Sequence, residues 1–186
     1  MLEALGILVV LAVLIGVWVA AMYNRLRALQ YACADAWSLV DVQLQRRADL
    51  VPNLVATVRA YAAHERSILE AVTAARAQAD PMHEPSVAHA RAEVQLSAAI
   101  ARTVALREQY PQLAAATNFT QLQRTLADLE NEIAASREIY NGNVAAYRDR
   151  LGQWPSSMVA KQYRFEDRPL FQLELAIERA PSTVVL

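Results

Sequence analysis

FTQLQRTLADLENEIAASREIYNGNVAAYRDRL, residues 119–151, is the stretch that decides the fold. Apolar side chains recur in it every three or four residues, as on one face of an α-helix, and only Ser136 interrupts the series. The spacing predicts one long amphipathic helix, and Asn118 with Gln121 resembles a capping pair at its start. The residues of this seam are Phe119, Leu122, Leu126, Leu129, Ile133, Tyr140, Val144, Tyr147 and Leu151.

The region before this stretch also has helical periodicity. We expect a helix over Pro52–Gln78 and an alanine-rich helix over Ser86–Gln109, joined by a proline-bearing turn at Ala79–Pro85. A helix over Tyr23–Val51 precedes them and continues an apolar N-terminal segment without interruption. Because short connections make neighbouring helices antiparallel, we predict an all-α fold. It comprises an N-terminal transmembrane helix and an antiparallel up-down helical bundle of about four helices, the first long and kinked near Pro52.

The N-terminal segment ALGILVVLAVLIGVWVAAM, residues 4–22, predicts a membrane anchor. These 19 uncharged residues would span about 28 Å as a helix, close to the thickness of a bilayer's hydrocarbon core. A cleaved signal peptide is the alternative, but the residues before the segment include Glu3 and no Lys or Arg. Arg25 and Arg27 follow the span, so the positive-inside rule predicts an outside N-terminus and a cytoplasmic main domain.

Composition and motifs exclude several classes of function. A net charge of −1 argues against a nucleic-acid-binding protein. No spacing of His, Cys, Asp or Glu suits a metal site, and no phosphate loop or nucleophile motif is present, so we expect no cofactor and no enzyme activity. His64, His83 and His89 are interpreted as surface or capping residues, and the helical carboxylates as solvated faces with ion pairs. The single Cys33 is interpreted as a buried apolar side chain.

The most unusual polar concentration is DVQLQRRADLVPNLV, residues 41–55. In one interpretation it is a hinge: the proline frees helix carbonyls, and Arg47 and Asn53 donate hydrogen bonds to them. In the other, Leu39, Val42 and Leu50 lie with Arg46 on the reverse side of the first helix and dock a protein. Asp41 and Arg47 flank the core seam in both. The candidate interaction or hinge residues are Leu39, Asp41, Val42, Arg46, Arg47, Asp49, Leu50, Pro52 and Asn53.

Residues 36–76 and 110–151 closely resemble the two signature blocks of the LemA family of bacterial membrane proteins. The order of a membrane helix, a helical region and a proline-bearing tail also resembles that family. The resemblance implies one membrane anchor, an antiparallel helical bundle that is usually cytoplasmic, and no established enzyme activity. It also implies a link to specialised internal membranes, with which one relative in the family is associated.

We therefore expect three parts: a transmembrane anchor (1–22), a helical bundle (23–153) and a C-terminal tail (154–186) that packs on the bundle or is partly disordered. The leading hypothesis is a non-enzymatic scaffold at the bacterial inner membrane that binds a protein partner or assembles as a homo-oligomer. No small-molecule substrate is evident. The alternative is an extracytoplasmic sensory or ligand-binding bundle, with a pocket between helices near the alanine-rich helix.

Overall fold

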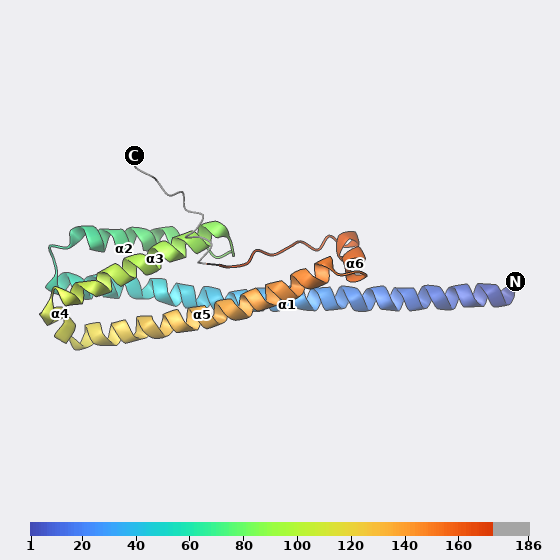
Figure 1. Cartoon of the computed structure of the whole chain (residues 1–186), viewed down its shortest axis with the longest axis horizontal. Coiled ribbons are helices and arrows are strands. Elements are labelled where there is room, and N and C mark those ends of the chain that lie inside the picture. The colour runs from blue at the N-terminus through green and yellow to red at the C-terminus, as the bar shows by residue number, and fades with distance from the viewer. Residues whose placement is uncertain (173–186) are drawn as a thin grey trace, which may run out of the picture.

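The computed structural model describes residues 1–172, and the regular elements among these residues are all helices (Figure 1). The all-α prediction is confirmed. In chain order the elements are α1 (Leu2–Tyr61), α2 (Arg66–Ala79), α3 (Val87–Ala105), the 3₁₀ helix η1 (Leu106–Glu108), α4 (Pro111–Ala115), α5 (Thr117–Gly152) and α6 (Ser156–Gln162).

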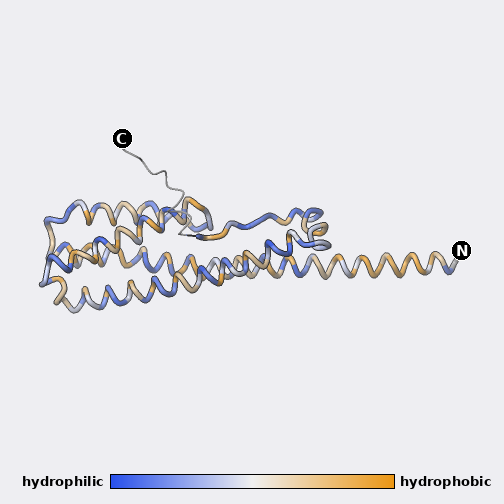
Figure 2. Tube along the Cα trace, in the orientation of Figure 1, coloured by the Kyte–Doolittle hydropathy of each residue, from blue (hydrophilic) through white to orange (hydrophobic). Residues whose placement is uncertain are grey.

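The first helix, α1, joins the apolar segment to the bundle without a break. Its N-terminal part extends alone beyond the other helices and is coloured hydrophobic along its length (Figure 2). Within the described residues, α1 alone is long and apolar enough to cross a membrane, and none of its most apolar stretch is buried against the rest of the chain. An apolar helix that finds no protein partner needs a lipid environment, so this part of α1 is the part of the chain that associates with a membrane.

The bundle is built on the antiparallel pair of α1 and α5, which pack along each other. Two contacts set their register: the side-chain amide of Asn143 donates to the carbonyl of Ala32 at 3.1 Å, and Arg47 reaches Glu130 at 2.6 Å. The hairpin of α2 and α3 packs over the half of α1 that is far from the anchor. Two apolar cores result, one under the hairpin and one between α1, α5 and α6.

The boundary between the first two helices differs from the sequence prediction. We expected a helix to start at Pro52, but α1 continues through Pro52 to Tyr61, and the chain turns before α2 starts at Arg66. The expected cap at Asn118 is also wrong, because α5 starts at Thr117 after Ala116 and has no side-chain cap. Ser86 instead caps α3, where its hydroxyl accepts a hydrogen bond from the N–H of His89 at 3.0 Å.

The chain after α6 runs over the bundle without regular structure as far as residue 172. Its carbonyls at Glu166 and Pro169 accept hydrogen bonds from the hydroxyls of Tyr147 (3.0 Å) and Tyr140 (2.8 Å). Phe171 is fully buried, so this segment belongs to the second core. The short strand or helix expected near residues 171–177 lies mostly outside the described residues.

Candidate functional site

The candidate segment of α1 divides into one buried residue and a largely exposed remainder. Leu39, Val42, Arg46, Asp49, Pro52 and Asn53 are exposed, and Asp41 and Leu50 are half-buried. Arg47 is fully buried. It lies between the core residues Leu44 and Val51, at the three- and four-residue spacing of the seam itself, so its position is central rather than flanking.

The guanidinium of Arg47 joins α1 to both neighbouring helices. Its Nη2 binds the carboxylate of Glu93 on α3, which is also buried, and its Nη1 lies 2.6 Å from Oε1 of Glu130 on α5. Nη1 also donates to the hydroxyl of Ser97. The Nε of Arg47 is buried without a hydrogen-bond partner. The cluster therefore ties three helices together at one level of the bundle.

Histidine 89 extends this cluster on α3. Its Nε2 lies 3.4 Å from Oε1 of Glu93, and its Nδ1 lies 3.1 Å from the carbonyl of Glu84. The interpretation of His89 as a surface or capping residue and of Glu93 as a solvated carboxylate is wrong, since both are buried. One signal was available in the sequence: His89, Glu93 and Ser97 follow each other at four-residue spacing, and that row faces the core.

This cluster shows no room for a substrate. The hollow beside it, between Asp41, Gln45, Asp80, His89 and Glu93, has a volume of about 10 Å³, which is room for about one water molecule and far too little for a substrate. Among residues 1–172, no group of three or more His, Cys, Asp or Glu side chains is arranged to hold a metal ion. Burial raises the pKa of the Cys33 thiol, as expected for an unreactive core cysteine. The geometry of the cluster suits structural ion pairing.

The carbonyl that Pro52 frees has a partner from another helix. A proline at position 52 has no N–H for the carbonyl of Ala48, four residues earlier. The Nε of Arg76 on α2 donates to that carbonyl at 2.9 Å. The hypothesis that Arg47 and Asn53 supply this donor is wrong. The guanidinium of Arg47 binds the carboxylates of Glu93 and Glu130 instead, and the side chain of Asn53 is exposed.

The exposed side of the segment borders a groove between α1 and α5. The groove has a volume of about 480 Å³, and Arg46, Asp49 and Leu50 line it from α1. The residues that line it from α5 are Thr125, Asp128, Leu129 and Glu132. Three of the lining residues carry carboxylates and one carries a guanidinium, so the groove is acidic.

Apolar side chains continue this surface toward the membrane anchor. Leu39 precedes Arg46 by seven residues on α1, and Ile139 follows Glu132 by seven on α5, so each lies on the same side of its helix as the groove residue. The register of the two helices brings Leu39 and Ile139 to nearly the same level. Both are exposed, as is Val42. We call the groove together with Leu39, Val42 and Ile139 the α1/α5 face.

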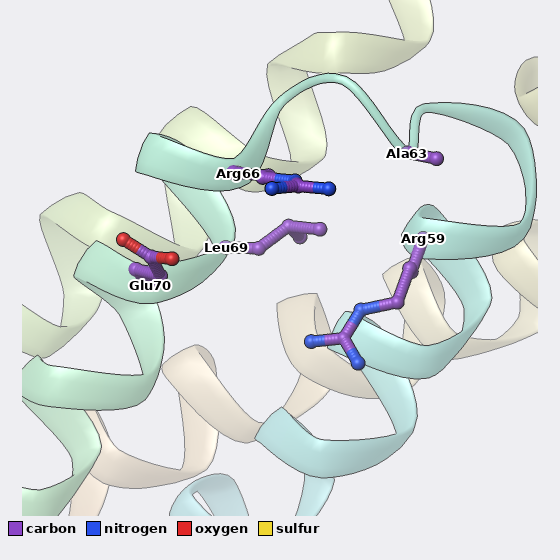
Figure 3. A pocket seen from close by; sticks show the side chains of 5 residues that line it. All are labelled: Arg59, Ala63, Arg66, Leu69 and Glu70. Carbon is purple, nitrogen blue, oxygen red and sulfur yellow. The ribbon is translucent and has the colours of Figure 1, made fainter.

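Other hollows in the described part of the chain lie away from this face. At the end of the bundle far from the anchor, Arg59 of α1 and Arg66 of α2 lie on either side of Leu69 in a hollow of about 400 Å³, which Ala63 and Glu70 also line (Figure 3). Between α3 and α5, a groove of about 380 Å³ has mostly apolar and small walls. Its lining residues are Ser97, Ile100, Ala101, Val104, Gln123, Leu126, Ala127 and Glu130.

Comparison with known proteins gives one family and, among the relatives, magnetosome proteins. The model of the LemA family matches residues 36–185. Magnetosome protein MamQ of Magnetospirillum gryphiswaldense is 34% identical over 62 residues, which is 33% of this chain and 23% of that protein. Magnetosome protein MamQ 2 of Paramagnetospirillum magneticum is 30% identical over 74 residues, 40% of this chain and 27% of that protein. The matched segment thus spans about a quarter of the length of these curated relatives.

Proposed function

The chain belongs to the LemA family, and from this premise we propose that it is a non-enzymatic, membrane-tethered helical scaffold that binds another protein through the α1/α5 face. The observation that carries the proposal is the exposure of Leu39 (56%) and Val42 (48%) on the α1/α5 face, on a helix whose opposite side is the core seam. A helix with one solvated side does not need large apolar residues there.

The charge of the α1/α5 face indicates the chemistry of the partner. Asp49, Asp128 and Glu132 outnumber Arg46 in the groove. A second copy docked face to face would place acidic groove against acidic groove, which is unfavourable. A different protein with apolar anchors flanked by Lys or Arg complements the face better, and we therefore favour a heterologous partner over self-assembly.

The buried cluster supports this role by making the face rigid. From the core side of α1, opposite the exposed residues, Arg47 fixes this helix against α5 and α3. Because a preformed surface loses less conformational entropy on binding, a rigid helix pair is a better docking site than a mobile loop.

The cellular setting of the proposal comes from the anchor and the family. We propose that the anchor lies in the bacterial inner membrane with the N-terminus outside, as the flanking Arg25 and Arg27 indicate. The bundle then faces the cytoplasm. The similarity to magnetosome proteins, with the family's link to internal membranes, supports a role in organising a membrane.

Site-specific photocrosslinking in intact cells tests the docking face. A photoreactive amino acid replaces Val42 in one variant and Val87 of α3, which is similarly exposed (46%), in the control. We expect a discrete adduct from position 42 and none from position 87, and loss of that adduct when Leu39→Asp is added. Mass spectrometry of the adduct separates a different protein from a second copy. Equal, diffuse labelling from both positions, with a monomeric protein in mild detergent, would contradict the proposal.

One observation favours a second function, the sensory or ligand-binding bundle. The apolar groove between α3 and α5 lies along the alanine-rich helix, where such a pocket is expected, and is large enough for a small apolar ligand. This function requires the bundle outside the cytoplasm. Protease added to spheroplasts would then digest the bundle, and Ala101→Trp, which fills the groove, would abolish any ligand-induced rise in melting temperature. Protection of the bundle in spheroplasts would eliminate this candidate.

A further inference from the structure

The short helix α6 lies at the end of the bundle from which the N-terminal part of α1 continues alone (Figure 1). It packs on both α1 and α5. Val159 and Ala160 of α6 are buried in the second core, and Val19 and Met22, the last residues of the apolar run, pack against that same core. Because Val19 and Met22 belong to the membrane-spanning segment, α6 is placed at the level where that segment leaves the bilayer.

Aromatic contacts hold the chain after α6 at the same level. The ring of Tyr23 lies 5.0 Å from that of Tyr163 and 5.5 Å from that of Phe165, both in edge-on geometry. The guanidinium of Arg27 lies over the ring of Phe165 at 5.8 Å. Residues on both sides of Lys161 and Arg164 are therefore fixed beside the first turns of α1 beyond the membrane.

The outward side of this region has the composition of a membrane interface. Trp154 is 80% exposed and Met158 is 63% exposed, and Tyr163 is also exposed. On α6, Met158 lies opposite the buried Val159 and Ala160, and Lys161 shares its side of the helix. Amphipathic aromatic rings and long cationic side chains are the residues that favour the boundary between lipid and water.

We propose that this surface, defined by Trp154, Met158, Lys161, Tyr163 and Arg164, inserts into the interface of the same bilayer that α1 crosses and forms a second, peripheral membrane contact. Trp154 and Met158 enter the headgroup and acyl boundary, while Lys161 and Arg164 meet anionic lipid headgroups. The bundle is thereby held at a fixed height and tilt rather than swinging on one helix. The inference rests on the anchoring of α1 and is independent of the α1/α5 face.

Spin-label accessibility in vesicles tests the second contact on the full chain. Cys33→Ala removes the native thiol, and a nitroxide is attached at one of three introduced cysteines: Leu8→Cys in the anchor, Met158→Cys, or Leu39→Cys. Leu39 is the matched control, because it is exposed and apolar but lies about 26 Å along α1 from Met22. The vesicles contain phosphatidylethanolamine and phosphatidylglycerol, and collision with oxygen and with a water-soluble nickel chelate is measured.

We expect the ratio of oxygen to nickel collisions to be highest at position 8, several-fold lower at 158, and lowest at 39. A label at 158 that matches the label at 39 would overturn the inference and leave the anchor and the docking face intact. A label at 158 shielded from both reagents would show a protein contact there and would also overturn it. A water-like label at position 8 would refute the anchoring itself. Trp154→Cys provides a second position on the surface and should repeat the result of position 158.

Discussion

The Nε of Arg76 on α2 donates to the carbonyl of Ala48 on α1 at 2.9 Å. That carbonyl is the one that loses its helical donor because residue 52 is proline. A side chain from the next helix thus supplies the hydrogen bond that the backbone of α1 lacks at this point. The same contact attaches the hairpin of α2 and α3 to α1. The proline that interrupts the hydrogen bonds of α1 therefore also creates the site where α2 attaches.

A double-mutant cycle should detect this relationship. In the wild-type background, Arg76→Met leaves the half-buried carbonyl of Ala48 without a donor, and we expect a loss of about 1–3 kcal/mol in the free energy of unfolding. Pro52→Ala restores the backbone N–H, so Arg76→Met should cost clearly less in that background. Urea unfolding of the full chain in detergent micelles, followed by circular dichroism, measures both. Equal costs in the two backgrounds would show that the contact is incidental.

Among the candidate residues of α1, Arg47 should be the one whose substitution lowers the free energy of unfolding most. Arg47→Met leaves the buried carboxylate of Glu93 uncompensated, and breaking such a pair costs about 3–5 kcal/mol. The double variant Arg47→Met, Glu93→Met replaces the pair with apolar side chains and should recover most of that loss. The same unfolding measurement checks both variants. The neighbouring, exposed Arg46→Met is the control and should stay within about 0.5 kcal/mol of wild type; an equal loss there would contradict the assignment.

The fold follows from periodicity, whereas the buried cluster required knowledge of which helices meet. The ladder of residues 119–151 and the apolar run of residues 4–22 depend only on local spacing, and each forms the expected helix. Arg47, Glu93 and Glu130 are separated by dozens of residues, and the spacing within each helix does not show that the three side chains meet. The helix boundary after Pro52 could not be predicted either, because the donor that compensates the proline comes from Arg76 on another helix.

Alkaline pH should destabilise the bundle through Tyr140. Burial raises the pKa of Tyr140 from 10.0 to about 12, so the unfolded chain loses this proton at a lower pH than the folded chain. The protonated Tyr140 therefore contributes its full share of the free energy of unfolding below pH 10. This contribution is lost as the pH rises from about 10 to about 12. Tyr140→Phe should reduce the slope of unfolding free energy against pH in this range. Its cost at neutral pH should be about 1 kcal/mol, from the lost hydrogen bond to Pro169. An unchanged slope would contradict the prediction.

Phe171 should determine whether the chain after α6 stays on the bundle. Its side chain is fully buried, and its ring lies 4.9 Å from that of Trp37 and 5.3 Å from that of His89. Its N–H donates to Oδ1 of Asn141 at 2.9 Å, and its carbonyl accepts from Nδ2 of the same residue at 3.2 Å. One residue therefore carries both the apolar and the polar attachment of this segment.

Phe171→Ala should cost about 3–5 kcal/mol in the free energy of unfolding, because it removes a large ring from a filled core. Release of the segment should also make the peptide bond after Arg164 accessible to trypsin, so we expect faster cleavage there under native conditions, before the bundle is digested. Limited proteolysis with mass spectrometry follows the order of cuts. Tyr31→Ala removes an exposed aromatic ring and serves as the control. If Phe171→Ala were cut no faster than this control, the segment would be held by the backbone contacts to Tyr140 and Tyr147 instead.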